Sequence, residues 1–78
     1  MVAIKTNIND TVRKRMFTLM DSAIALGKVK NMKEWCAKIN LHYTNIYQIQ
    51  EGRQTFTHEQ IYKAVKLVGS SVNYVYGL

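Results

Sequence analysis

The chain has 78 residues and a formal net charge of +6, with eleven Lys and Arg against five Asp and Glu, one cysteine and no proline. This length provides for one domain, residues 1–78, whose core is too small to enclose a catalytic cleft, so we expect no enzyme. A lone cysteine excludes an internal disulfide and favours a reducing cytoplasm. No apolar run approaches the ~20 residues of a membrane span, so we expect no membrane partner.

The first periodic segment predicts a long helix that follows a flexible arm at residues 1–6. Apolar residues recur every three or four positions, which is typical of one buried helix face. These residues are Ile8, Val12, Met16, Leu19, Met20, Ala23 and Leu26. Asn7 or Asn9 can cap this helix, and Gly27 ends it.

A second, shorter helix is predicted from Asn31 to Asn40. Asn31 and Glu34 have the spacing of a capping box, in which each side chain binds the backbone of the other residue. The buried stripe consists of Met32, Trp35, Cys36 and Ile39. Asn40 tolerates the left-handed backbone conformation and can turn the chain sharply. Leu41, the next residue, is then expected to bury its apolar side chain beneath this turn.

A third helix is expected to begin at His42 or Thr44 and to run through Gln50, with Ile46 and Ile49 facing inward. A loop follows at residues 53–56.

Beyond this loop, Thr57 and Gln60 form a second capping box, which opens a fourth helix. Its buried stripe consists of Ile61, Ala64, Val65 and Val68. Gly69 ends the helix, and Ser71 can cap a last short turn that holds Val72 and Val75. Together these patterns predict an all-α fold with four or five short helices.

The stretch from Lys33 to Arg53 carries the residue types that a helix-turn-helix requires. A small residue, Cys36, stands where two helices must cross closely. Asn40 supplies the turn, inward-facing branched residues anchor the second helix, and Gly52 lets the chain leave. We therefore predict a helix-turn-helix over about residues 31–51.

These residues resemble the lambda-repressor-like (Cro-type, XRE) helix-turn-helix regulators of phages and bacteria. The positions that fit the family pattern are Glu34, Lys38, Ile39, Leu41, Thr44, Ile46, Tyr47, Ile49 and Gly52. A second pattern, from Thr57 to Gly77, is similar to the family's C-terminal helices, so the resemblance covers about Ile8 to Gly77. It implies a compact four- to five-helix DNA-binding domain, acting as a transcriptional regulator of repressor type in the bacterial cytoplasm, associated with the nucleoid.

The resemblance also implies that residues 43–50, which carry no charge, enter the major groove of double-stranded DNA and read its sequence. Amide and hydroxyl side chains suit the donor and acceptor pattern of base edges. The expected base contacts are Tyr43, Thr44, Asn45 and Gln48. Of these, Asn45 can bind a phosphate or a neighbouring base instead. The expected phosphate contacts, which position the protein without reading sequence, are Lys33, Lys38, His42, Tyr47 and Arg53.

One alternative is a protein-interaction module, antitoxin-like or an adaptor, that keeps the fold without specific DNA binding. Two departures from the family pattern favour it. Met32 stands where the family often has a phosphate-binding Gln, and the carboxylate of Glu51 would oppose a phosphate.

For the regulator, we expect a homodimer, at least on DNA, bound to a pseudo-palindromic operator, because one small domain with few phosphate contacts binds weakly. Tyr62, Tyr74 and Tyr76 are candidates for core filling or for the patch between subunits. No cofactor or metal is expected, because His42 and His58 lack partners at metal-ligand spacing.

Overall fold

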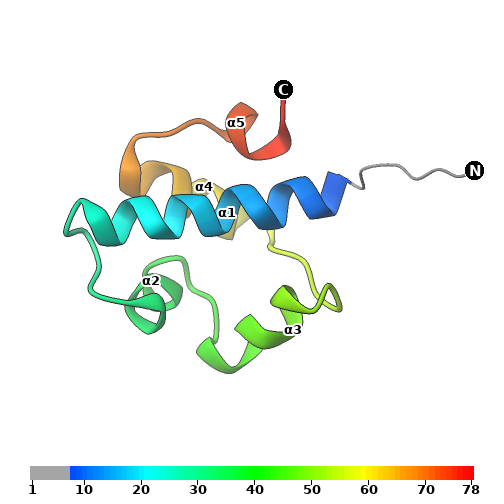
Figure 1. Ribbon diagram of the computed structural model, residues 1–78, viewed down its shortest axis with the longest axis horizontal. Helices are drawn as coiled ribbons and strands as arrows, with labels where there is room; N and C mark the ends of the chain where they lie inside the picture. The colour runs from blue at the N-terminus through cyan, green and yellow to red at the C-terminus, as the bar shows by residue number, and fades with distance from the viewer. Residues whose placement is uncertain (1–7) are drawn as a thin grey trace, which may run out of the picture.

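Helix α1 (Ile8–Ala25) crosses the middle of the molecule, and the other helices pack around it (Figure 1). The computed structural model describes residues 8–78, so the expected arm at 1–6 and the candidate cap Asn7 lie outside the described residues. After α1 come α2 (Met32–Lys38), the 3-10 turn η1 (Tyr43–Asn45), α3 (Ile46–Gln50), α4 (His58–Val68) and α5 (Val72–Tyr76). Residues 8–78 contain no strand, which makes this part of the chain all-helical.

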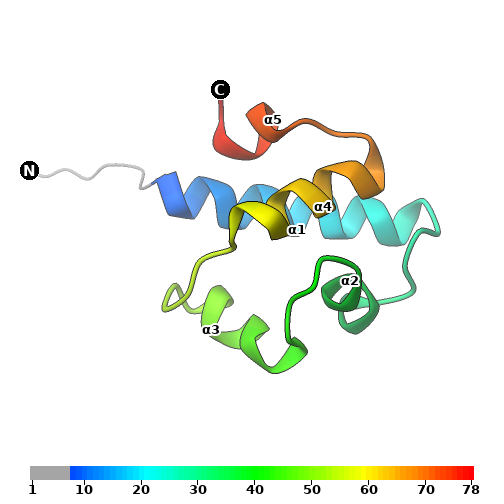
Figure 2. The same ribbon diagram turned by 180° about the vertical axis from the view of Figure 1, so that it is seen from behind.

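The helices form two groups on either side of α1. In Figure 1, α5 lies above α1, and α2 and α3 lie below it. Figure 2, seen from behind, shows α4 running along α1 on the face that Figure 1 hides. The contacts agree, because α1 packs against α4, α5 and α2. The segment from α2 to α3 therefore stands on one side of a scaffold made by α1, α4 and α5.

One hydrophobic core joins the five α-helices of residues 8–78. Its members are Val12, Met16, Leu19, Ala23, Val29, Trp35, Cys36, Ile39, Leu41, Ile46, Ile49, Phe56, Ile61, Ala64, Val65 and Val75. Three aromatic rings meet within it, since the Phe17, Trp35 and Phe56 centroids lie 5.8 to 6.1 Å apart in each pair. Such tilted and edge-on arrangements suit the ring quadrupoles. This cluster joins α1, α2 and the loop before α4.

Most predicted helix caps are confirmed. Asn31 accepts a hydrogen bond from the Glu34 backbone N–H at 2.9 Å, and Thr57 and Gln60 complete a reciprocal capping box. The first capping box is wrong in one half, because the Glu34 carboxylate accepts from the Lys30 N–H at 2.7 Å instead of from Asn31.

Both ends of the first helix differ from the prediction. Asn9 is the second residue of α1 and so cannot be its cap. Leu26, predicted to be buried, is 61% exposed. Gly27 adopts a left-handed backbone with φ of 77°, which turns the chain after α1 and leaves Leu26 in solvent. Val29 in the connector is buried in its place.

The predicted third helix is divided into η1 and α3, and the predicted second helix ends at Lys38 rather than at Asn40. The earlier end of α2 follows from the turn at Asn40, whose left-handed φ of 63° stops the helix. The predicted inward residues Ile46 and Ile49 are buried. In α5, Val75 is buried, but Val72 is 38% exposed, because this short helix presents one side to α1.

Candidate nucleic-acid interface

The connection between α2 and η1 is a tight reversal centred on Asn40. The Leu41 N–H donates to the carbonyl of Cys36 at 2.8 Å, which closes the end of α2. Asn40 takes the left-handed conformation that few residues other than Gly tolerate, and Leu41 is buried beneath the turn. The reversal is therefore held by backbone geometry and by an apolar plug, as the sequence predicted.

The inner side of α3 is anchored in the core. Ile46 and Ile49 are at most 1% exposed, and the small side chain of Cys36 on α2 is fully buried with them. Burial of a branched side chain contributes roughly 1.5–3 kcal/mol. This five-residue helix is too short to be stable alone, so these two side chains hold its orientation.

The outer side of η1 and α3 presents an uncharged face, which we define as Tyr43, Thr44, Tyr47 and Gln48. Thr44, Tyr47 and Gln48 are exposed, and Tyr43 is half-buried. Asn45, the other expected base contact, is half-buried as well. The uncharged face therefore brings three of the four expected base contacts together with the expected phosphate contact Tyr47.

Two aromatic rings of the uncharged face support each other. The rings of Tyr43 and Tyr47 meet edge-on with centroids 6.4 Å apart. Interaction with the Tyr47 hydroxyl raises the pKa of Tyr43 above its usual value. A tyrosine hydroxyl can both donate and accept a hydrogen bond, so Tyr43 can contact an acceptor or a donor on a ligand.

His42 lies at the start of η1, and its ring Nδ1 is 3.0 Å from the Thr44 hydroxyl oxygen. Both side chains are exposed. The hydrogen bond fixes them against each other at the edge of the uncharged face. Thr44 retains further hydrogen-bonding capacity, since a hydroxyl can donate once and accept twice.

The expected phosphate contacts do not all gather beside the uncharged face. Lys33 and Lys38 are exposed on α2, but five residues separate them by about 140° around the helix, so they face different directions. Lys38 lines a groove with α4. Arg53 lies just beyond α3, where its guanidinium pairs with the carboxylate of Glu51, and this pair reduces its charge toward a ligand.

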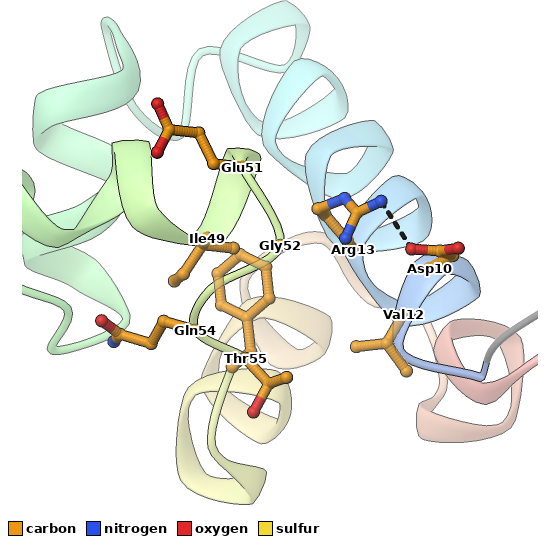
Figure 3. Close-up of a pocket in the computed structure, with 9 residues that line it drawn as sticks. Asp10, Val12, Arg13, Ile49, Glu51, Gly52, Gln54 and Thr55 are labelled. Carbon is orange, nitrogen blue, oxygen red and sulfur yellow. Dashed lines mark hydrogen bonds and ion pairs between the residues drawn. The ribbon is translucent and has the colours of Figure 1, made fainter.

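From the sequence, Arg13 is expected only to add to the positive field, but the structure brings it to the end of α3 (Figure 3). It lines a hollow of about 210 Å³ between the start of α1 and the loop after α3. Its guanidinium bonds Asp10 at 2.6 Å and lies 3.5 Å from where a Cβ on Gly52 would stand. No local sequence signal reveals this neighbour, because the contact spans almost forty residues of chain.

Two of the tyrosines considered for a subunit patch are engaged within the chain. The Arg15 guanidinium lies 4.6 Å from the ring centre of Tyr74 and donates to the Tyr74 carbonyl at 2.8 Å. The Tyr76 hydroxyl is 2.8 Å from Nδ1 of His58. Tyr62, by contrast, is 55% exposed. Tyr74 and Tyr76 thus tie α5 to α1 and α4.

No family model, no curated protein and no solved structure matches this chain. Within residues 8–78, no helix has the length and apolar character to cross a membrane. The same part of the chain holds no cluster of His, Cys, Asp and Glu side chains suited to a metal ion.

Proposed function

We propose that this protein is a sequence-specific regulator of transcription that binds double-stranded DNA and inserts residues 43–50 into the major groove. One observation carries the proposal. Two short helices are joined by a left-handed turn at Asn40, and the second has branched residues in the core and uncharged polar residues in solvent. This arrangement supports the proposal that residues 31–51 form a helix-turn-helix within a lambda-repressor-like domain.

The chemistry of the uncharged face supports reading of bases rather than general attraction to phosphate. The Gln48 amide can pair with the N6 and N7 edge of adenine, and the Thr44 methyl and hydroxyl suit a thymine methyl or an acceptor. Tyr43 adds a hydroxyl donor. Lys33 on α2 and Arg53 after α3 supply charge for the phosphates, although Glu51 offsets part of the charge of Arg53. Such contacts set register without reading sequence.

The small number of cations beside the uncharged face supports binding as a homodimer on a pseudo-palindromic operator. Few phosphate contacts give weak, salt-sensitive binding. Two copies on half-sites about 34–36 Å apart combine their contacts. Such a regulator acts in the bacterial cytoplasm, associated with the nucleoid.

Selection of preferred sites from random duplexes tests this function. We expect an enriched motif with two related half-sites and, in sedimentation, a complex that contains two chains. Gel shifts at two salt concentrations then separate specific from general affinity. If no motif is enriched and all duplexes bind alike, the proposal of sequence reading is wrong.

A second candidate function is a protein-interaction module. Glu51 favours it, because this exposed carboxylate stands at the end of α3 and pairs with Arg53, where it would repel a phosphate. The module predicts no gel shift with any duplex at low salt and a protein partner that protects residues 43–50 from hydrogen exchange. A selected DNA motif would exclude this reading.

A further inference from the structure

Beyond residues 43–50, a second surface has the form of a binding site. An open hollow of about 430 Å³ lies between the end of α2 and one side of α4. We call it the lysine groove, and its lining residues are Lys38, Tyr62, Lys63, Lys66 and Leu67. It is wide open to solvent, so it suits a chain segment lying on the surface better than an enclosed small molecule. Two helices far apart in the sequence form it, so no local pattern predicts it.

The charges of the lysine groove are incompletely neutralised. Lys63 pairs with Glu59 at 3.2 Å along α4. Lys66 lies with its Nζ 5.3 Å from the ring centre of Tyr62, which leaves its charge in place. Lys38 takes part in none of the ion pairs found in residues 8–78. The groove therefore combines two cations that lack a carboxylate partner there with the apolar bodies of Tyr62 and Leu67.

We infer that the lysine groove docks an acidic, partly apolar peptide segment of another protein. Carboxylates would pair with Lys38 and Lys66, and an apolar side chain would cover Leu67 and the ring of Tyr62, which is 55% exposed. Charge complementarity of this kind gives an interface its specificity. The inference is independent of DNA reading by residues 43–50.

Two other occupants fit the groove less well. A second copy of this chain carries a net charge of +6 and only five acidic residues, so like charges would meet. A single strand binds by stacking successive bases on several aromatic rings, and the residues that line the groove include one ring, that of Tyr62. Duplex phosphates would pair with the lysines but would leave Leu67 uncovered.

The test uses the full chain and a fluorescent amphipathic peptide of about 12 residues made of Glu and Leu, a length that forms a short helix in a groove. A second peptide has Gln at every Glu position. We expect saturable binding of the Glu peptide and weaker binding of the Gln peptide. Chemical shifts should change around Lys38, Tyr62 and Leu67 and not around residues 43–50.

Charge reversal supplies the matched control. Lys38→Glu should weaken peptide binding at least about tenfold, because it places a carboxylate opposite a carboxylate. Lys28→Glu changes the net charge equally at an exposed position outside the groove and should change binding less than about threefold. Circular dichroism verifies that both variants fold.

Four outcomes would overturn the inference. Binding of the Glu peptide could fail to saturate, or the Gln peptide could bind as tightly as the Glu peptide. The Lys38→Glu and Lys28→Glu proteins could also lose the same affinity for the Glu peptide. Alternatively, a random duplex could displace the peptide and itself bind Lys38→Glu less well than Lys28→Glu. This last result would assign the lysine groove to the DNA footprint.

Discussion

The side-chain amide of Gln60 in α4 donates a hydrogen bond to the backbone carbonyl of Asn40, 3.4 Å away, at the turn between α2 and η1. The oxygen of the same side chain accepts from the Thr57 N–H at 2.9 Å. Gln60 is 9% exposed and is the buried polar residue of the described chain. It therefore connects the cap of α4 to the turn that orients α3.

Replacing the donor of Gln60 tests this connection. Gln60→Glu keeps an acceptor for Thr57 but turns a carboxylate oxygen toward the Asn40 carbonyl, so we expect a loss of about 1–3 kcal/mol in the free energy of unfolding. Urea unfolding at pH 7 measures it. Gln50→Glu, at an exposed position, is the control and should change stability little. Equal unfolding midpoints for the two variants would contradict the linkage.

The left-handed turn makes Asn40 sensitive to substitution. With φ of 63°, Asn40→Ala should cost about 1–2 kcal/mol, since a Cβ without a compensating amide is strained there. Asn40→Gly should stay near the parent stability, because glycine relieves the strain but gains entropy when unfolded. Thermal unfolding distinguishes the two. A smaller loss for Ala than for Gly would argue against a conformational role.

Gln48→Ala tests the reading of bases. On the selected site, we expect a loss of about 1–3 kcal/mol in binding free energy and relaxed preference at one base pair. Gln50→Ala removes an amide from the same helix but outside the uncharged face, and it should have a small effect. Equal losses on selected and random duplexes would refute the role of Gln48 as a base contact.

The pair between Glu51 and Arg53 predicts a gain of function. Glu51→Gln removes a carboxylate near the proposed phosphate path and frees Arg53, so affinity should rise about two- to fivefold on all duplexes at low salt. The salt dependence should steepen. Glu59→Gln, which also removes one negative charge but from a pair on α4, controls for net charge. A gain of the same size in both variants would show a general field effect.

Cys36 makes stability depend on pH in the alkaline range. Burial raises the pKa of this thiol from its ordinary 9.0 to about 11. Between these values the unfolded chain releases the proton while the folded chain keeps it, so stability is full below pH 9 and falls as pH approaches 11. The expected loss is about 2–3 kcal/mol. Cys36→Ala should lack this component, and parallel pH profiles of the two proteins would contradict it.

The caps and buried helix faces could be predicted because their causes are local. Asn31, Thr57 and Ser71 each accept from a backbone N–H three residues ahead, a distance at which the sequence alone specifies both partners. The same holds for the turn, where Asn40 and Leu41 suffice. Periodicity likewise identified Ile46 and Ile49 as the inner side of α3.

Burial in the connections could not be predicted in the same way. Phe56 and Val29 lie outside the helices, where no period marks a buried side, yet both are core residues. Phe56 is buried because the loop after α3 brings its ring against Phe17 and Trp35. Leu26 fits the helical period but follows the end of α1, so the left-handed turn at Gly27 exposes it.

The sequence by itself thus determined most of the helices, the caps at Asn31, Thr57 and Ser71, and the outward-facing set of uncharged side chains, because each depends on neighbours within a few residues. Only the tertiary structure decided the surroundings of the basic side chains. The packing of α4 against the segment after α2 places Lys38 in the lysine groove, and the approach of α1 to Gly52 brings Arg13 to the end of α3. A charge acts through space on its neighbours, and these neighbours come from distant parts of the chain.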